Sequence, residues 1–190
     1  MIENFPNDSG QSLKQSNLKK LTTGSILLAR DILKDPNFDS SVVLVCVHSI
    51  EGSYGLVLNR ASHMPLSEIF DGFQDSKLKR EVFIGGPVSQ DELQVLQVTE
   101  NPVEGAFAIA PRVYLGGKWE GIGHMIETDP SRTHLFLGYS GWSKGQLESE
   151  VAAGAWDVYN INIEKLLLDG TSKLMVDLKQ LISYLEKFQH

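Results

Sequence analysis

The chain has 190 residues, 42% of them hydrophobic, and its 17 basic and 24 acidic side chains give a formal net charge of −7. This length suits one domain with a substantial core, since roughly 70% of the unfolded surface is buried at this size. The negative charge opposes attachment to a phosphate backbone, so direct DNA binding is not expected. A single cysteine excludes an intrachain disulfide, and no apolar run approaches the ~18 residues of a membrane span.

The first 22 residues are predicted to form a flexible polar segment ahead of one domain at 23–190. They are rich in Asn, Ser, Gln and Lys and carry too little apolar surface to order strongly by themselves. Leu13, Leu18 and Leu21 could still support a short helix that docks on the domain. The segment also lacks the apolar stretch of a secretory signal, so we expect a cytoplasmic protein.

The strands expected first along the chain lie at 26–29, 41–48 and 54–59. The run from Ser41 to His48 is almost entirely β-branched or aliphatic and has no polar face. This pattern is typical of a central strand that is covered on both sides. The turn Glu51-Gly52-Ser53 then predicts that this strand forms a hairpin with the next one.

The rest of the chain mixes short strands with helices. The pattern predicts a short helix at 65–73, an exposed connection at 75–80, strands at 82–84, 93–98 and 106–109, a helix at 119–128, strands at 133–139 and 156–161, and a terminal helix at 172–187. Strands outnumber helices, and hairpins outnumber crossovers. The expected fold class is therefore α+β, with a mostly antiparallel or mixed sheet that can curl toward a barrel and helices packed outside.

In the segment 138–150, which reads G-Y-S-G-W-S-K-G-Q-L-E-S-E, nearly every residue can be given a role in the local structure. Ser143 and Gln146 form an S-x-x-Q capping box, which predicts a helix that begins at Lys144. Trp142 and Leu147 would then occupy the two positions of a hydrophobic staple at the start of that helix.

This segment, with the Ala-Trp pair that follows it, resembles the signature of the YqgE/AlgH family of bacterial proteins. Further matches occur in order along the chain, at the opening strand 24–29, the D-P-x-F to His stretch 35–48, the G-L-V-L-N motif 55–59 and the G-G-P motif 85–87. The resemblance covers about residues 24–165. It implies a regulatory role, as in alginate synthesis or transcription, in a family that has no established biochemical activity.

The leading hypothesis is a non-enzymatic binding or regulatory protein whose partner is a protein or a small ligand. Its candidate binding residues come from the three family motifs: Asn59, Arg60, Gly85, Gly86, Pro87, Tyr139, Trp142, Gln146 and Glu150. The alternative for the last motif is structural, because indoles commonly bury their area in a core and Gln146 can complete a helix cap.

The competing hypothesis is a small thiol-dependent enzyme or redox sensor centred on Cys46 with His48. Residues i and i+2 of a strand share a face, and a neighbouring cation would stabilise a thiolate. Their Cα atoms would be about 6.6 Å apart, so a direct bond requires both side chains to lean together. A small buried cysteine and a histidine that bonds the backbone are the structural alternative.

Three other chemistries find less support. Ser140 lies in a G-Y-S-G turn, but a nucleophile elbow needs glycine where Trp142 stands, and the only later histidine is His190. Histidines at 48, 63, 124 and 134 show no metal-ligand spacing. Glycines at 85–86, 116–117 and 121–123, with arginines at 30, 60 and 112, could cradle a phosphate but match no P-loop. We therefore expect neither a metal nor a cofactor.

Overall fold

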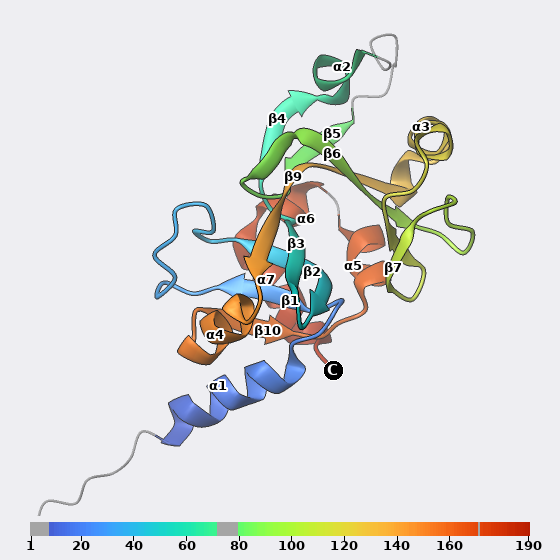
Figure 1. Cartoon of the computed structure of the whole chain (residues 1–190). Helices are drawn as coiled ribbons and strands as arrows, with labels where there is room; N and C mark the ends of the chain where they lie inside the picture. Colours follow the sequence, from blue (N-terminus) through green and yellow to red (C-terminus); the bar gives the residue numbers. More distant parts are fainter. Residues whose placement is uncertain (1–7, 72–79, 171) are drawn as a thin grey trace, which may run out of the picture.

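A computed structural model of the chain describes residues 8–71, 80–170 and 172–190. Ten strands form one sheet, with helices on its outside (Figure 1). The strands are β1 (Ile26–Ala29), β2 (Val42–Ser49), β3 (Gly52–Val57), β4 (Ala61–Pro65), β5 (Glu81–Ile84), β6 (Val88–Val98), β7 (Phe107–Ala110), β8 (Val113–Leu115), β9 (Thr133–Ser143) and β10 (Trp156–Tyr159). The helices are α1 (Asp8–Lys20), α2 (Leu66–Ile69), α3 (Trp119–Thr128), α4 (Gln146–Ala153), α5 (Ile163–Asp169), α6 (Ser172–Val176) and α7 (Leu178–Phe188), with a 3-10 turn at Pro130–Arg132.

The sheet confirms the expected α+β class. Its hydrogen-bonded order is β10-β1-β2-β3-β9-β6-β8-β7, and β5 joins it by pairing with both β4 and β9. All these pairs are antiparallel except β5 with β9. Because β10 and β7 stand at opposite ends of this order, the sheet curls without closing into a barrel.

Strand β2 lies in the middle of one half of the sheet, as its apolar run predicted. It pairs with β1 on one side and forms the expected hairpin with β3 on the other. Leu44 and Cys46 enter one apolar cluster, which the C-terminal helices cover. Val43 and Val45 enter a second cluster, which contains the indoles of Trp142 and Trp156. The strand is therefore covered on both faces.

Strand β9 connects the two halves of the sheet. Its first part pairs with β5 and β6, whereas residues 140–143 pair with β3. The change from β5, which pairs with residues 135–137, to β3 has Gly138 in between, and its φ of 66° is left-handed, whereas β6 stays paired as far as Tyr139. A Cβ atom there would lie 2.6 Å from the Val88 carbonyl oxygen, so only glycine fits this corner.

Several elements differ from the sequence prediction. The helix expected at 65–73 is only the short α2, and strand β4 precedes it. The terminal helix is divided into α6 and α7, because the Asp177 side chain caps α7 by accepting from the Gln180 N–H. Strand β8 and helix α5 were not predicted, whereas α3 lies where it was expected. Most of the connection predicted at 75–80 falls outside the described residues.

Residues 8–20 form helix α1, which lies beside α4 and β10 (Figure 1). Leu21, directly after it, is buried, whereas Leu13 and Leu18 are exposed. Helix α1 is thus joined to the domain mainly at its C-terminal end. In the described part of the chain, none of the helices combines the length and the apolar character that crossing a membrane requires.

Candidate functional site

The signature segment forms a hydrogen-bonded network around the carboxylate of Glu150. One oxygen, Oε2, accepts from the indole nitrogens of Trp142 and Trp156 at 3.0 and 2.9 Å. The other, Oε1, accepts from the side-chain amide of Gln146 at 3.0 Å. The two indole rings meet edge to face, with their centroids 6.1 Å apart, and Phe38 packs on both. This network fastens α4 to the sheet.

Helix α4 begins two residues later than the capping box predicted. The Ser143 N–H donates to Gln146 Oε1 at 3.0 Å, which is one half of the expected box. Ser143, however, is the last residue of β9, and Gly145 occupies the cap position with a left-handed φ of 72°. The glycine allows the chain to turn directly from strand into helix. The staple residues Trp142 and Leu147 do enter the same apolar cluster.

The G-G-P motif lies against the corner of β9. The Gly85 carbonyl accepts from the Val57 N–H at 2.8 Å and from the hydroxyl of Ser140 at 3.1 Å. A Cβ atom on Gly85 would lie 2.4 Å from the Gly138 oxygen, and one on Gly86 would meet the Tyr139 carbonyl. Ser140 itself is fully buried. Its hydroxyl therefore serves to hold this crossing of strands, and Pro87 is exposed beyond it.

The G-L-V-L-N motif (55–59) meets the G-G-P motif along the backbone through the Val57–Gly85 bond and, one residue outside each motif, through the Ile84 N–H, which donates to the Arg60 carbonyl at 2.7 Å. The side chains of this motif have other partners. The Asn59 amide bonds the Val42 N–H and the Ser40 carbonyl, each at 2.9 Å. The Arg60 guanidinium donates to the Asn37 carbonyl. The three motifs thus converge through their backbones, while their polar side chains support neighbouring loops.

Cys46 and His48 lie on opposite faces of the sheet. A β-bulge between positions 45 and 47 of β2 adds one residue and reverses the expected alternation. Cys46 is completely buried beside Leu44, and this burial raises the pKa of its thiol well above the usual range. His48 instead faces α4, where its ring contacts Glu148. The prediction that the two side chains share a face is therefore wrong.

His48 belongs to a polar row that the sequence analysis missed. Its Nδ1 lies 2.8 Å from the Ser53 hydroxyl, and its Nε2 lies 3.8 Å from Glu148 Oε1. Ser53 is 8% exposed and sits opposite His48 in the β2–β3 hairpin. The only sequence feature that pointed to this row was the expected β2–β3 hairpin, and the bulge in β2 shifts the register of that hairpin. Because Ser53 is buried on the Nδ1 side of His48, this row is better suited to anchor the hairpin to α4 than to present a serine nucleophile to a substrate.

The burial of Cys46 predicts a slow thiol. We expect an alkylating reagent to modify the native protein at least ~100-fold more slowly than the urea-unfolded protein, because the thiol must first be exposed by opening of the sheet. Mass spectrometry of a timed iodoacetamide reaction measures both rates. Equal rates in the two states would restore the thiol hypothesis.

The described residues that were considered for phosphate or metal binding do not come together in one site. Gly121 and Gly123 lie inside helix α3 and form no phosphate-binding turn. Arg112 bonds Glu164 at 2.5 Å, and Arg30 pairs with Asp157. Within the described ranges, no group of three His, Cys, Asp or Glu side chains is arranged to hold a metal ion.

An apolar cleft opens between the β2–β3 hairpin and strands β7 and β8. Its volume is about 370 Å³, and its lining includes Val47, Tyr54, Phe107 and Leu115, with Ser49 and Glu51 at the hairpin end. Phe107 is 52% exposed, an unusual position for a large aromatic side chain. Tyr54 stacks on Tyr139, a predicted binding residue, with 4.6 Å between ring centroids. The cleft brings apolar side chains from distant segments of the chain to one open volume.

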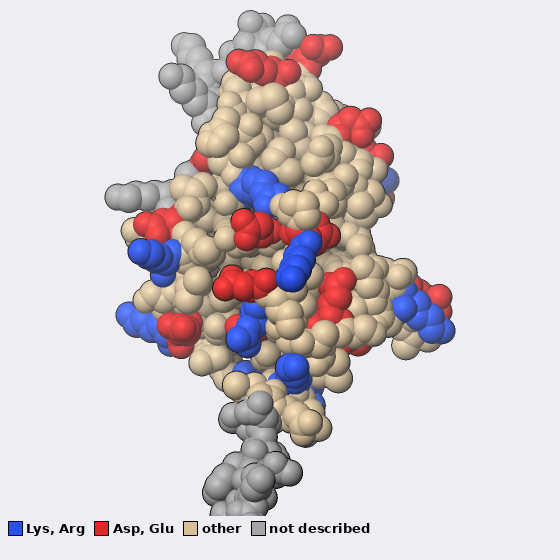
Figure 2. All heavy atoms as spheres, turned by 90° about the vertical axis from the view of Figure 1, so that its left-hand side faces the viewer, with Lys and Arg blue, Asp and Glu red and all other residues tan. Residues whose placement is uncertain are grey.

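The face shown in Figure 2 has no extended basic surface among the described residues. There, Lys and Arg side chains alternate with Asp and Glu across the described residues. Such interspersed charges do not follow a nucleic acid backbone.

Comparisons with known proteins agree with this architecture. A profile described as AlgH-like matches residues 26–179. A UPF0301 protein of Chlorobaculum tepidum is 36% identical over 81% of this chain and 83% of its own length, and one from Chlamydia trachomatis is 35% identical over 84% and 86%. The solution structure of the AlgH protein from Pseudomonas aeruginosa shares the fold, with a TM-score of 0.66, 24% identity and coverage of 100% of this chain and 99% of that one. The crystal structure of DIP2367 from Corynebacterium diphtheriae has a TM-score of 0.58 and 24% identity, over 83% of this chain and 78% of that one. The chain belongs to the AlgH-like family.

Proposed function

We propose that this chain is a non-enzymatic, cytoplasmic binding protein whose partner is another protein, held in the cleft between the β2–β3 hairpin and strands β7 and β8. The observation that carries the proposal is the contrast between the two candidate sites. The polar side chains of the signature motifs are used in internal hydrogen bonds, whereas the cleft offers unpaired apolar surface. The regulatory role rests on the family resemblance.

The chemistry of the cleft favours an apolar anchor on a basic partner. Phe107, Leu115 and Tyr54 provide a hydrophobic floor of the kind in which one aromatic or aliphatic side chain of a partner becomes a hot spot. Glu51 lines the cleft, and the pKa of Tyr54 is raised mainly by burial, with the charge of Glu92 as the smallest of the contributing effects. Acidic groups beside an apolar cleft attract a segment with Lys or Arg next to its anchor.

The test compares partners captured from a bacterial lysate by the wild-type chain and by two variants. Phe107→Asp places a carboxylate at the cleft, and Leu168→Asp makes the same change at a 44% exposed position on α5. We expect the first variant to reduce recovery of a stoichiometric partner at least ~10-fold, because a charge in an interface core is costly, and the second to retain it. Circular dichroism shows whether each variant is folded. A partner that folded Phe107→Asp captures as well as the wild type would contradict the proposal.

A further inference from the structure

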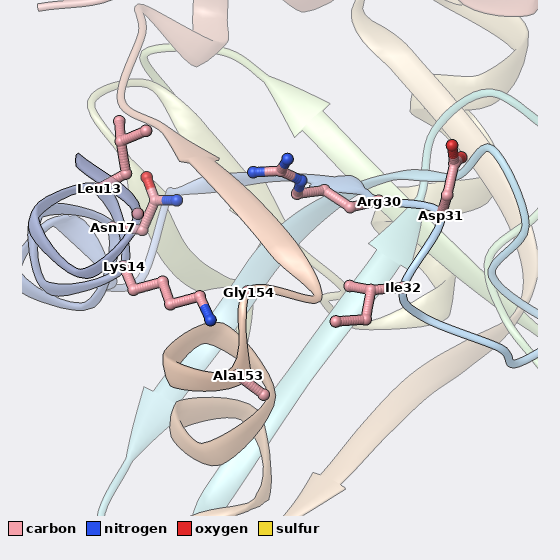
Figure 3. A pocket seen from close by; sticks show the side chains of 9 residues that line it. Leu13, Lys14, Asn17, Arg30, Asp31, Ile32, Ala153 and Gly154 are labelled. Carbon is pink, nitrogen blue, oxygen red and sulfur yellow. The ribbon is translucent and has the colours of Figure 1, made fainter. Parts of the chain in front are cut away.

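Strand β10 stands at one end of the sheet, and a side chain covers its outer edge. Its inner edge pairs with β1, which leaves the Val158 N–H and the Trp156 carbonyl pointing outward. The Asn17 amide of α1 accepts from Val158 N at 3.4 Å and donates to the Trp156 oxygen at 3.3 Å. Figure 3 shows Asn17 directed from α1 toward this strand. An amide side chain thus takes the donor and acceptor that a neighbouring strand would use.

Helix α1 is attached firmly at its C-terminal end, where the Lys20 carbonyl accepts from the Ser25 hydroxyl at 3.0 Å and from the Asn160 amide at 3.1 Å, and more loosely before it. Of residues 10–20, only Asn17 and Lys20 are not exposed, and Leu13 is 60% exposed. A cavity of about 500 Å³ lies between α1 and Ile32 beside the end of α4, which Lys14 reaches at Gly154 (Figure 3). The bonds of Asn17 are long, and a helix of 13 residues is marginal by itself. Lifting the described residues 10–17 from the edge therefore breaks the Asn17 bonds and the packing of Lys14 on Gly154, while the Lys20 carbonyl keeps its bonds to Ser25 and Asn160.

We propose that α1 is a displaceable cover and that the occupant which replaces it is strand β10 of a second copy of this chain. A free strand edge is its own complement across a two-fold axis, because each edge carries both donors and acceptors. When the two-fold axis passes between the Val158 residues of the two copies, these valines lie opposite each other. Asp157 of one copy then lies opposite Tyr159 of the other. A register centred on Asp157 would oppose two carboxylates, which is unfavourable. The cover lies before residue 26, where the family match begins.

This surface lies apart from the apolar cleft, so the inference is independent of the proposed function. The two surfaces share no lining residue. A dimer through β10 would leave the cleft of each copy open.

The test uses the full chain with Asn17→Asp. The carboxylate cannot donate to the Trp156 oxygen and is repelled by Asp157, which Asn17 now contacts at 3.3 Å. The control Gln15→Glu makes the same change of charge at an exposed position of α1. Light scattering after size exclusion, over a concentration series, gives the mass, and hydrogen exchange reports the Val158 amide.

We expect Asn17→Asp to lower the dimer dissociation constant at least ~10-fold relative to the wild type, because the competing cover is removed, and Gln15→Glu to leave it unchanged. Adding Val158→Pro to Asn17→Asp should abolish the dimer, since it removes the outward donor and leaves the partner edge unsatisfied. A folded Asn17→Asp chain that stays monomeric would overturn the inference. A dimer that survives Val158→Pro would also overturn it, because another surface would then join the copies.

Discussion

Replacing Glu150 with alanine is expected to lower the free energy of unfolding by about 4 kcal/mol, because it leaves two indole N–H groups unsatisfied at ~1–3 kcal/mol each. Both donors belong to rings with almost no access to water, since Trp142 is 5% and Trp156 0% exposed. The same change removes the acceptor of Gln146 at the start of α4. The effect is thus far larger than that of a usual surface glutamate.

Urea denaturation followed by tryptophan fluorescence measures this change. Glu150→Gln is the milder variant, because its amide keeps one acceptor oxygen for the indoles. We expect it to lose about half as much stability as Glu150→Ala. Glu127→Ala, at an exposed position of α3, serves as the control and should change stability by less than about 0.5 kcal/mol. If all three variants unfolded at the same urea concentration, the carboxylate would have no structural role.

The local features of the signature segment could be read from the sequence, because they depend on residues a few positions apart. The staple of Trp142 with Leu147 and one half of the capping box are present. The start of the helix was misplaced because β9 continues through Ser143, which its pairing with Gly52 of β3 stabilises. That pairing spans about ninety residues of sequence and overrides the local cap preference.

The separation of Cys46 from His48 has the same kind of cause. Strand periodicity predicted a common face, and the bulge in β2 removed it. A bulge is set by the register of both strands and by what packs on each face, so it leaves no mark in the run of valines itself. For the same reason the Ser53–His48–Glu148 row could not be foreseen.

The apolar cleft depends on still more distant contacts. Tyr54 and Val47 come from the β2–β3 hairpin, and Phe107 and Leu115 come from strands near the other end of the sheet order. Strand β8 is three residues long and lies beyond the strand that the pattern predicted at 106–109. The fold class followed from composition and alternation, whereas the cleft required the order of the strands, which those patterns do not specify.

His134 occupies a site that disfavours the charged form of its ring. It lies on β9 next to Thr133, whose hydroxyl accepts from Arg80 Nη2 at 2.8 Å. Its Nε2 is buried and lacks a hydrogen-bond partner, as far as the described residues show. Burial, and secondarily the charge of Arg80, lowers the pKa of His134 from 6.5 to about 4. The folded chain therefore holds this imidazole neutral across the mildly acidic range.

We expect the chain to lose stability on acidification through this residue. Between pH 6.5 and about 4 the unfolded chain binds a proton at His134 that the folded chain excludes, so the free energy of unfolding falls as pH falls. The difference of about 2.5 pKa units corresponds to about 3 kcal/mol. His134→Gln cannot be protonated, so its stability should fall by about 3 kcal/mol less than that of the wild type over this range.

Urea denaturation at pH 7.5, 5.5 and 4.5 measures how the free energy of unfolding of each chain depends on pH. His124→Gln, at an exposed position on α3, controls for the loss of a histidine. Parallel pH profiles for the wild type and His134→Gln would show that the buried ring is not the source of acid sensitivity.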